Sequence, residues 1–234
     1  MTRDRWLTVK LGILGLASMA AAGLLSLVLG WWASPIDHAA TIQSVGGFES
    51  RFFPVAFGTR GIAPIGYAAF AFALGVLIGL LARRAVPAMA LTLVVFAAVQ
   101  IAFPLGIRPH LIRPVRVSAP LTASVIQGFG INQDGSLVQV FAGSPDLPGA
   151  WIISSTVVTA AGSTHLGAPP AACQSQQGPQ PCINALAQMN LRQVILYQPA
   201  GRYWTFQWIE LGIFLTAAIL LAWACFRLVR RRLS

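Results

Sequence analysis

The chain has 234 residues, of which 56% are hydrophobic and only 9% are charged. A soluble domain carries about 25% charged residues, so this composition argues against a water-soluble fold. The net charge of +10 would suit a nucleic-acid partner, but the cations lie at the ends of apolar runs and form no basic stripe with interleaved aromatic residues. That placement argues for membrane topology and against nucleic-acid binding.

The first predicted membrane span covers residues 11–33, LGILGLASMAAAGLLSLVLGWWA. A helix of this length crosses a hydrocarbon core about 30 Å thick. The alternative is a signal peptide with Arg3, Arg5 and Lys10 as its charged flank, although the apolar run exceeds the usual core of about 7 to 15 residues. We therefore expect a span that stays in the protein.

The first span is predicted to end at Ser34-Pro35, because proline has no N–H to continue the helical ladder. Trp31 and Trp32 precede this point, as expected at a membrane interface. Residues 37–62 are mixed polar, glycine and aromatic, and we expect a loop on the outer membrane face with its phenylalanines dipped toward the membrane.

Two further spans are predicted over residues 64–82 and 85–107. The pair Arg83-Arg84 separates them and indicates a cytoplasmic turn. Pro87 fits the first turn of the third helix, where its missing N–H costs little, and Pro104 is predicted to mark the exit of that helix.

Residues 108–205 form the only polar stretch long enough to fold in water, and we predict a small α/β domain there. Strand-like patterns cover residues 137–141, 151–158 and 193–197, and residues 184–192 resemble a short helix.

The cysteines give an independent indication of the compartment. Cys173 and Cys182 lie in this domain, and a disulfide between them would add about 2 to 3 kcal/mol in the chain-entropy model and would suit an extracytoplasmic location. Two free thiols are the alternative. Cys225 lies at the inner end of the last span.

The last span is predicted over residues 206–226, followed by the basic tail RLVRRRLS. Basic residues prefer cytoplasmic segments, so both termini and the Arg83-Arg84 turn are predicted to be cytoplasmic, in a multi-pass protein of the cell membrane. Arg108 is an exception to this preference, because it is predicted to lie close to the outer membrane face. The predicted fold is an all-α membrane bundle of about four helices, with an extracytoplasmic α/β domain between the third and fourth. Its predicted segments are residues 1–107, 108–205 and 206–234.

No catalytic constellation, metal site or cofactor motif is visible. The chain has no phosphate-binding loop of the G-x-x-x-x-G-K-[ST] form, and His38, His110 and His165 are widely separated. We therefore expect no enzyme activity.

Glu210 is the one acidic residue near lipid, and burying a charge is costly enough that such a residue suggests function. The alternative is a hydrated side chain in a first helical turn, which the helix dipole favours. Gly75 and Gly79 form a small-x-x-x-small pair that predicts close helix packing, either in a helix bundle or at an oligomer contact. Ser18, Thr92 and Gln100 either line a path or hydrogen-bond to neighbouring helix backbones.

Several runs together resemble one family of membrane proteins: TRDRWLTVKLG, WWASPID, PIGYAAFAFALGVLIGLLARRAVPAMALTLVVFAAVQ, RPHLIRP and YQPAGRYWTFQWIELGIFL. They resemble ABC transporter permeases of the ABC-2 exporter type from high-GC Gram-positive bacteria. Members of that family usually carry about two further helices and a cytoplasmic coupling segment before the stretch that resembles TRDRWLTVKLG. The resemblance therefore implies that this sequence lacks the N-terminal helices, through a start site placed too late or as a truncated relative.

The resemblance implies a permease subunit that exports a substrate with a separate ATP-binding subunit, in the bilayer and beside a second permease copy or paralogue. It implies contact with the ATP-binding subunit at Arg3, Arg5, Trp6, Arg83 and Arg84. Hydrated residues that set topology would explain the same arginines. The alternative function is a membrane-anchored extracytoplasmic binding or sensing protein.

Overall fold

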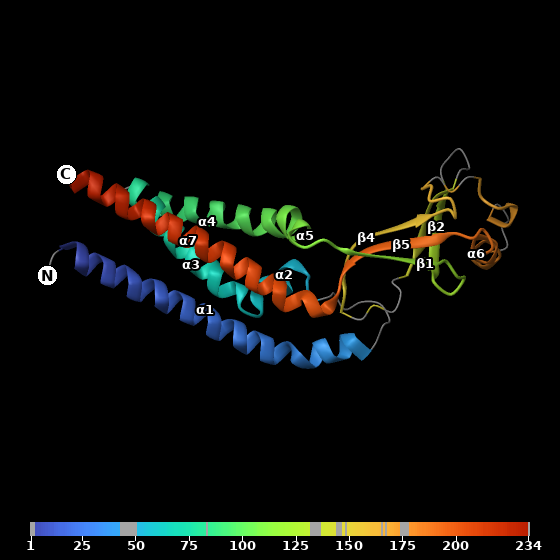
Figure 1. Cartoon of the computed structure of the whole chain (residues 1–234), viewed down its shortest axis with the longest axis horizontal. Coiled ribbons are helices and arrows are strands. Elements are labelled where there is room, and N and C mark those ends of the chain that lie inside the picture. Colours follow the sequence, from blue (N-terminus) through green and yellow to red (C-terminus); the bar gives the residue numbers. More distant parts are fainter. Residues whose placement is uncertain are drawn as a thin grey trace. The chain divides into compact units, whose positions relative to one another are not determined.

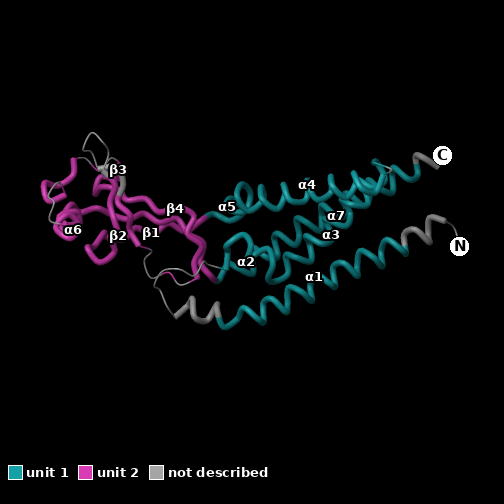
Figure 2. The backbone as a smooth tube through the Cα atoms, turned by 180° about the vertical axis from the view of Figure 1, so that it is seen from behind, with its two compact units in different colours: residues 1–113, 201–234 teal, residues 114–200 magenta. Residues whose placement is uncertain are grey.

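The computed structural model describes residues 3–42, 51–82, 84–131, 137–143, 147, 149–164, 166, 168–173 and 178–233, with the side chains of 3–8, 36–42, 131, 137–139 and 231–233 left out. The chain divides into two compact units. Unit 1 comprises residues 1–113 and 201–234, and unit 2 comprises residues 114–200 (Figure 2).

Unit 1 is a bundle of helices that lie side by side (Figure 1). Its central element is α3, which contacts α1, α4 and α7. The first turns of α1 and the last turns of α7 lie at the same end of the bundle (Figure 1). The helical elements are α1 (Arg3–Ile42), α2 (Pro54–Thr59), α3 (Ala63–Ala82), α4 (Ala85–Ala102), the π-helix η1 (Phe103–Ile107), α5 (Arg108–Leu111) and α7 (Tyr203–Leu233).

Four helical stretches in the described part of the chain are long and apolar enough to cross a membrane. They are Val9–Pro35, Ala63–Ala82, Ala85–Leu111 and Ala200–Arg230. Large apolar side chains on them face outward: Leu27 is 70% exposed, Trp31 80% and Val86 78%. Such a surface is costly in water and inexpensive in lipid. The four predicted spans are therefore matched by four helices suited to a bilayer.

Of the two prolines predicted to end a helix, Pro35 does not, and that prediction is wrong. Pro35 lies inside α1, which continues to Ile42. At Pro104 the α-helix has ended as predicted, since α4 stops at Ala102. The chain continues through the π-helix η1, where the N–H of Arg108 donates to the carbonyl oxygen of Phe103, five residues earlier. A π-turn of this kind accommodates an extra residue in the ladder. In membrane helices such local adjustments satisfy the backbone groups that a proline leaves open.

The predicted outer loop is also different in the structure. Its residues 37–42 continue α1, residues 43–50 lie outside the described part, and residues 54–59 form α2. Phe52 and Phe57 are buried in unit 1, with exposed fractions of 1% and 0%. Their rings lie 5.7 and 5.3 Å from that of Tyr203, so they pack in the protein and do not dip into lipid.

A close approach between two helices of the bundle involves Gly66 of α3. A Cβ atom at this position would lie 3.2 Å from the backbone oxygen of Leu211 and 3.2 Å from Cβ of Phe214, both in α7. Small side chains extend the contact, since Ala69 and Ala73 of α3 are buried with Ala218 of α7. The packing of α3 on α7 therefore depends on small residues.

Unit 2 contains two antiparallel sheets. The first has the strand order β1 (Val115–Pro120), β5 (Arg192–Gln198), β4 (Trp151–Val158), and the second pairs β2 (Ile126–Ile131) with β3 (Leu137–Ala142). Its other elements are η2 (Ala171–Cys173), α6 (Pro179–Ala187) and η3 (Ala200–Arg202), which crosses into unit 1.

Three of the strand-like patterns correspond to β3, β4 and β5, while β1 and β2 were not predicted. The predicted helix over residues 184–192 is wrong in position, because α6 ends at Ala187. Asn190 adopts φ 51°, a left-handed conformation that asparagine tolerates and that terminates helices. The boundary between the units also lies after Arg113 and not after Ile107.

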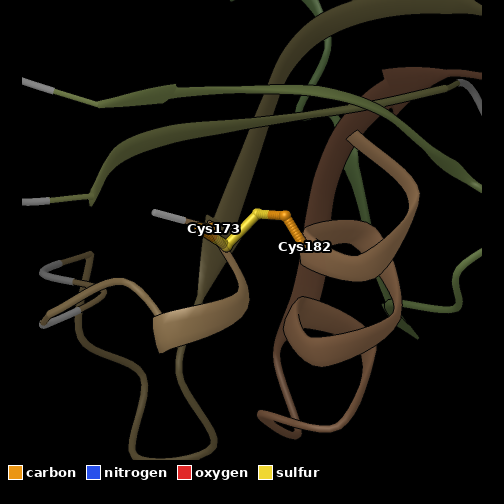
Figure 3. Close-up of a disulfide and its surroundings, with 2 residues drawn as sticks. All are labelled: Cys173 and Cys182. Carbon is orange, nitrogen blue, oxygen red and sulfur yellow. A yellow bond between two sulfur atoms is a disulfide. The ribbon is translucent and has the colours of Figure 1, made fainter. Parts of the chain in front are cut away.

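A disulfide joins Cys173 of η2 to Cys182 of α6 (Figure 3), as predicted. Their Cα atoms lie 4.3 Å apart. Cys182 belongs to the buried core of unit 2, together with Leu186 of α6 and Leu121, Ile126 and Val140 near or in the strands. The bond therefore fixes the segment before α6 to the core.

Candidate functional site

A buried polar cluster in unit 1 joins three helical elements. Arg108 begins α5, Tyr67 lies in the first half of α3, and Glu210 lies two turns into α7. Their exposed fractions are 2%, 5% and 0%. All three side chains are buried, so their polar atoms must find hydrogen-bond partners inside the protein.

Glu210 is the acceptor for both partners. Arg108 Nε donates to Glu210 Oε1 at 2.5 Å, and Arg108 Nη2 donates to Oε2 at 3.3 Å. The hydroxyl group of Tyr67 also donates to Oε2. This arrangement is a two-point pair between a guanidinium group and a carboxylate, the strong form of ionic hydrogen bond. The pair ties the end of the third span to the last span.

The guanidinium group of Arg108 has one nitrogen atom with no acceptor. Its Cζ lies 4.0 Å from the ring centroid of Phe57, which covers one face by a cation–π contact. Nη1 is buried and has no hydrogen-bond partner among the described residues. A buried, unsatisfied donor on a charged group costs free energy, so Nη1 is a site at which an acceptor would be stabilising.

Arg108 and Tyr67 also line a groove of about 360 Å³ at the surface of unit 1, which we call the Arg108 groove. One wall is α2, with Val55 and Gly58. The opposite wall is the end of α4 with η1. The remaining lining residues are Pro54, Thr59, Gln100, Ile101, Pro104 and Leu105. The groove is therefore mostly apolar with a few polar groups.

Gln207, one turn before Glu210, holds the wall formed by α2 in place. Its side-chain oxygen accepts from the N–H groups of Ile62 and Ala63 at 3.0 and 2.7 Å, and so caps the start of α3. Its amide nitrogen donates to the carbonyl oxygens of Phe57 and Arg60 at 3.2 and 2.9 Å. One buried side chain of α7 therefore hydrogen-bonds to backbone carbonyl groups at and after the end of α2 and to backbone N–H groups at the beginning of α3.

The structure corrects one interpretation of Glu210. Because α7 begins at Tyr203, Glu210 does not lie in a first helical turn, and its side chain has no exposed surface. The alternative of a hydrated carboxylate is therefore wrong. The sequence does not reveal the partners: Arg108 resembles the other arginines that flank the spans, and Tyr67 resembles an ordinary aromatic residue of an apolar helix. A lone arginine and a lone glutamate at the ends of two apolar helices were the available signal.

The residues expected to contact an ATP-binding subunit are only partly described. Arg3, Arg5 and Trp6 lie in the first turns of α1, but their side chains fall outside the described part, as does Arg83. Arg84 is exposed and directly precedes α4. The turn from α3 to α4 lies at the same end of the bundle as the two termini (Figure 1).

Gly75 and Gly79 line a second groove, of about 510 Å³, between α3 and α4. A Cβ atom on Gly75 would lie 3.6 Å from Thr92, whereas one on Gly79 would meet nothing within 4 Å. Within the chain, Gly75 therefore makes an ordinary contact with α4, and the tighter approach is at Gly66.

The polar residues of the spans have different environments. Ser18 and Thr92 hydrogen-bond to carbonyl oxygens of their own helices, those of Gly15 and Ala88. Gln100 lines the Arg108 groove. Among the described residues, no group of His, Cys, Asp and Glu side chains could hold a metal ion, and His110 lies 2.9 Å from the carbonyl oxygen of Gly106. His38 and His165 lie outside the residues whose side chains are described.

Comparison with known proteins adds one finding. Residues 1–108 match the family model described as ABC-2 membrane transporter related. No curated protein and no solved structure matches the chain. The matched part contains the first two candidate spans and all but the last three residues of the third, and it ends at Arg108. The match and the four apolar helices fit a multi-pass membrane component of a transporter.

Proposed function

We propose that the chain is the membrane-spanning permease subunit of an ABC-2 type exporter, powered by a separate ATP-binding subunit. The observation that carries the proposal is the match of residues 1–108 to a family of ABC-2 related membrane proteins. The four candidate spans provide the membrane component that such a transporter requires. A second copy of the chain or a paralogue would complete the membrane part.

The proposed orientation puts both termini and the turn before α4 in the cytoplasm, in the cell membrane. The described basic residues Lys10, Arg84, Arg227 and Arg230 lie near these segments, in keeping with the preference of basic residues for the cytoplasmic side. An ATP-binding subunit would contact this end of the bundle. Arg84 is the described residue best suited to that contact, because it is exposed in a turn between two spans.

The test is co-purification with any ATP-binding protein that is encoded beside this chain. The expected result is a stable complex whose ATP hydrolysis differs from that of the ATP-binding protein alone. The variant Arg84→Glu should weaken the complex by about tenfold, which corresponds to about 1.4 kcal/mol. Arg192→Glu is the matched control, because it makes the same charge reversal at an exposed residue of unit 2. Absence of any complex, or equal loss in both variants, would contradict the proposal.

A second candidate function is a membrane-anchored extracytoplasmic binding or sensing protein. It is favoured by unit 2, which has its own hydrophobic core and a disulfide. Under this alternative, the four helices anchor unit 2, and no ATP-binding protein is needed. A neighbouring gene for a kinase or regulator, together with failure to bind an ATP-binding subunit, would favour it over transport.

A further inference from the structure

The last turns of α7 present an outward face of aromatic and basic side chains, which we call the Trp223 face. Its four residues follow the spacing i, i+3, i+4, i+7, which puts them on one side of a helix: Trp223, Phe226, Arg227 and Arg230. All four are exposed, Trp223 by 56% and Phe226 by 41%. Cys225, which lies between them in the sequence, is buried instead. The Trp223 face is therefore the side of α7 that meets the surroundings of the protein.

The guanidinium group of Arg227 lies over the ring of Trp223, with Cζ 4.5 Å from the ring centroid. Side chains in a helix lean toward its N-terminus, so Arg227 reaches back along α7 to this ring. A cation–π contact covers one face of a guanidinium group and uses none of its N–H donors. Neither Arg227 nor Arg230 forms a side-chain hydrogen bond or an ion pair with another described residue. The N–H donors of both are therefore available to an acceptor outside the protein.

The Trp223 face lies where α7 leaves the apolar part of a bilayer. The last candidate span ends at Arg230, and tryptophan prefers the boundary between hydrocarbon and headgroups. Arg227 follows Trp223 by about 6 Å along the helix axis. Each headgroup layer is about 5 to 7 Å thick. With the ring of Trp223 at the boundary, the two arginines lie at the level of the lipid phosphate groups.

Charge complementarity favours an anionic headgroup. The charged side chains that follow Glu210 in the sequence are all arginines: Arg227, Arg230, Arg231 and Arg232. Glu210 itself lies about 25 Å before Arg227 along α7 and is paired with Arg108. A zwitterionic headgroup carries a cation of its own beside the phosphate, whereas an anionic headgroup offers a phosphate without one. The planar guanidinium group suits the two-point recognition of phosphate.

We propose that the Trp223 face binds one anionic phospholipid of the bilayer, whose phosphate accepts hydrogen bonds from Arg227 and Arg230. The acyl chains of this lipid lie against Trp223 and Phe226, and the ring of Trp223 holds the Arg227 guanidinium group at the level of the phosphate. A protein partner in the aqueous phase would cover the arginines but not the aromatic rings one turn deeper. The inference requires that α7 spans a membrane, and it holds whether or not the chain transports a substrate.

The measurement is phospholipid binding by the purified full chain in an uncharged detergent, titrated with phosphatidylglycerol or phosphatidylcholine and followed by native mass spectrometry. For the wild type we expect phosphatidylglycerol to bind about tenfold more tightly than phosphatidylcholine. Added salt should reduce this preference, because the charges are exposed and therefore screened. Equal affinity of the wild type for the two lipids would overturn the proposal.

Two double variants separate the Trp223 face from the net charge of the chain. Arg227→Gln/Arg230→Gln removes both proposed phosphate ligands. Arg116→Gln/Arg192→Gln removes the same charge from two exposed positions of unit 2. The preference for phosphatidylglycerol should fall to within about twofold of unity in the first variant and stay near about tenfold in the second. The same preference in both double variants would contradict the assignment to this face.

A tryptophan variant tests the positioning of Arg227. Trp223→Leu keeps an apolar contact for the acyl chains but removes the ring under the guanidinium group. An exposed cation–π contact contributes about 0.5 to 1 kcal/mol, so phosphatidylglycerol should bind about two- to fivefold more weakly. Trp208→Leu makes the same change at another exposed tryptophan of α7 and should leave the affinity unchanged. Equal affinities of the two variants would show that the ring does not position the lipid ligand.

Co-purification distinguishes a lipid from a protein partner at this face. Loss of an ATP-binding subunit by Arg227→Gln/Arg230→Gln, with the preference for phosphatidylglycerol retained, would show that the face binds protein and would overturn the proposal. Loss of the lipid preference with the complex intact would support it. The lipid titration contains this chain alone, so failure of the transport proposal would leave its result unaffected.

Discussion

The Nε atom of Arg108 lies 2.5 Å from the Oε1 atom of Glu210, although the two residues are 102 positions apart in the chain. Unit 2 is inserted between them in the sequence. The pair thus joins the two helical elements of unit 1 that the insertion separates. Removing one partner of a buried ion pair is strongly destabilising, because the remaining charge is then buried without a counter-charge.

Breaking this pair from one side should destabilise unit 1 strongly. Glu210→Leu leaves the buried guanidinium group without its carboxylate, and we expect a loss of about 3 to 5 kcal/mol in the free energy of unfolding. The double variant Glu210→Leu/Arg108→Met should recover part of this loss, because no unpaired charge remains. Unfolding in detergent, measured for both single variants and the double variant, gives the coupling energy. Strictly additive losses would contradict the described ion pair.

The contact between α3 and α7 should be sensitive to one methyl group. Gly66→Ala would place Cβ 3.2 Å from the backbone oxygen of Leu211, so the helices must separate, at a cost of about 1 to 3 kcal/mol. Gly79→Ala is the matched control in the same helix, where the added atom meets nothing within 4 Å. The thermal midpoint should fall for Gly66→Ala and stay level or rise for Gly79→Ala. Equal midpoints would show that the helices do not approach closely at Gly66.

The turn between α2 and α3 should require glycine at position 61. Gly61 has φ +84°, and an added Cβ would lie 2.8 Å from Cδ of Gln207. Gln207 cannot move away without losing its hydrogen bonds to Ile62 and Ala63. We expect Gly61→Ala to cost about 1 to 3 kcal/mol, from backbone strain alone and more if those bonds break. Gly30→Ala, in open space on α1, should be neutral or slightly stabilising in the same unfolding experiment.

The disulfide predicts how the three cysteines react. A maleimide that adds mass to each free thiol, applied to the denatured chain, should add one label before reduction and three afterwards. The single label before reduction should be lost in Cys225→Ala. Three labels without reductant would show that Cys173 and Cys182 are not bonded. Replacing both by alanine should destabilise unit 2 by about 2 to 3 kcal/mol in the chain-entropy model.

The proposed orientation is testable with cysteines introduced at exposed positions in the Cys225→Ala background. In intact cells, a membrane-impermeant maleimide should label Gln127→Cys of unit 2 and should leave Arg84→Cys unlabelled until lysis. This outcome follows from a cytoplasmic turn before α4 and an extracytoplasmic unit 2. The reverse pattern would invert the topology, and labelling of both in intact cells would reject a span between them.

The number of spans could be predicted because length and apolar character are properties of continuous segments. The positions at which helices end were harder to predict: α1 continues past Pro35, and α4 ends before Pro104 but is followed by a π-helix that was not predicted. Whether a proline ends a helix depends on how the neighbouring backbone groups are satisfied, and at Pro104 a π-turn satisfies them. No residue pattern around Pro104 predicts that π-turn.

The candidate site was only half visible in the sequence. Glu210 stood out because a carboxylate near lipid is rare, but its partners come from distant segments. Arg108 looked like one of several arginines flanking the spans, and Tyr67 like an ordinary aromatic residue of an apolar helix. Pairing of this kind is decided by the packing of α3, α5 and α7, which local patterns do not encode.

The way unit 2 begins and ends has a consequence for how the protein can vary. Val115, the first residue of β1, is paired with Tyr197 near the end of β5, and in unit 1 Arg202 donates to the carbonyl oxygen of Arg113 at 2.9 Å. The chain therefore leaves unit 1 and returns to it at neighbouring points, as it would through a simple hairpin. The inserted segment is joined to the helices of unit 1 at the same two neighbouring points, whatever residues that segment contains. Unit 2 could be shortened to a tight turn, lengthened or exchanged for another module, and the bundle would not need to change its spacing to accept it.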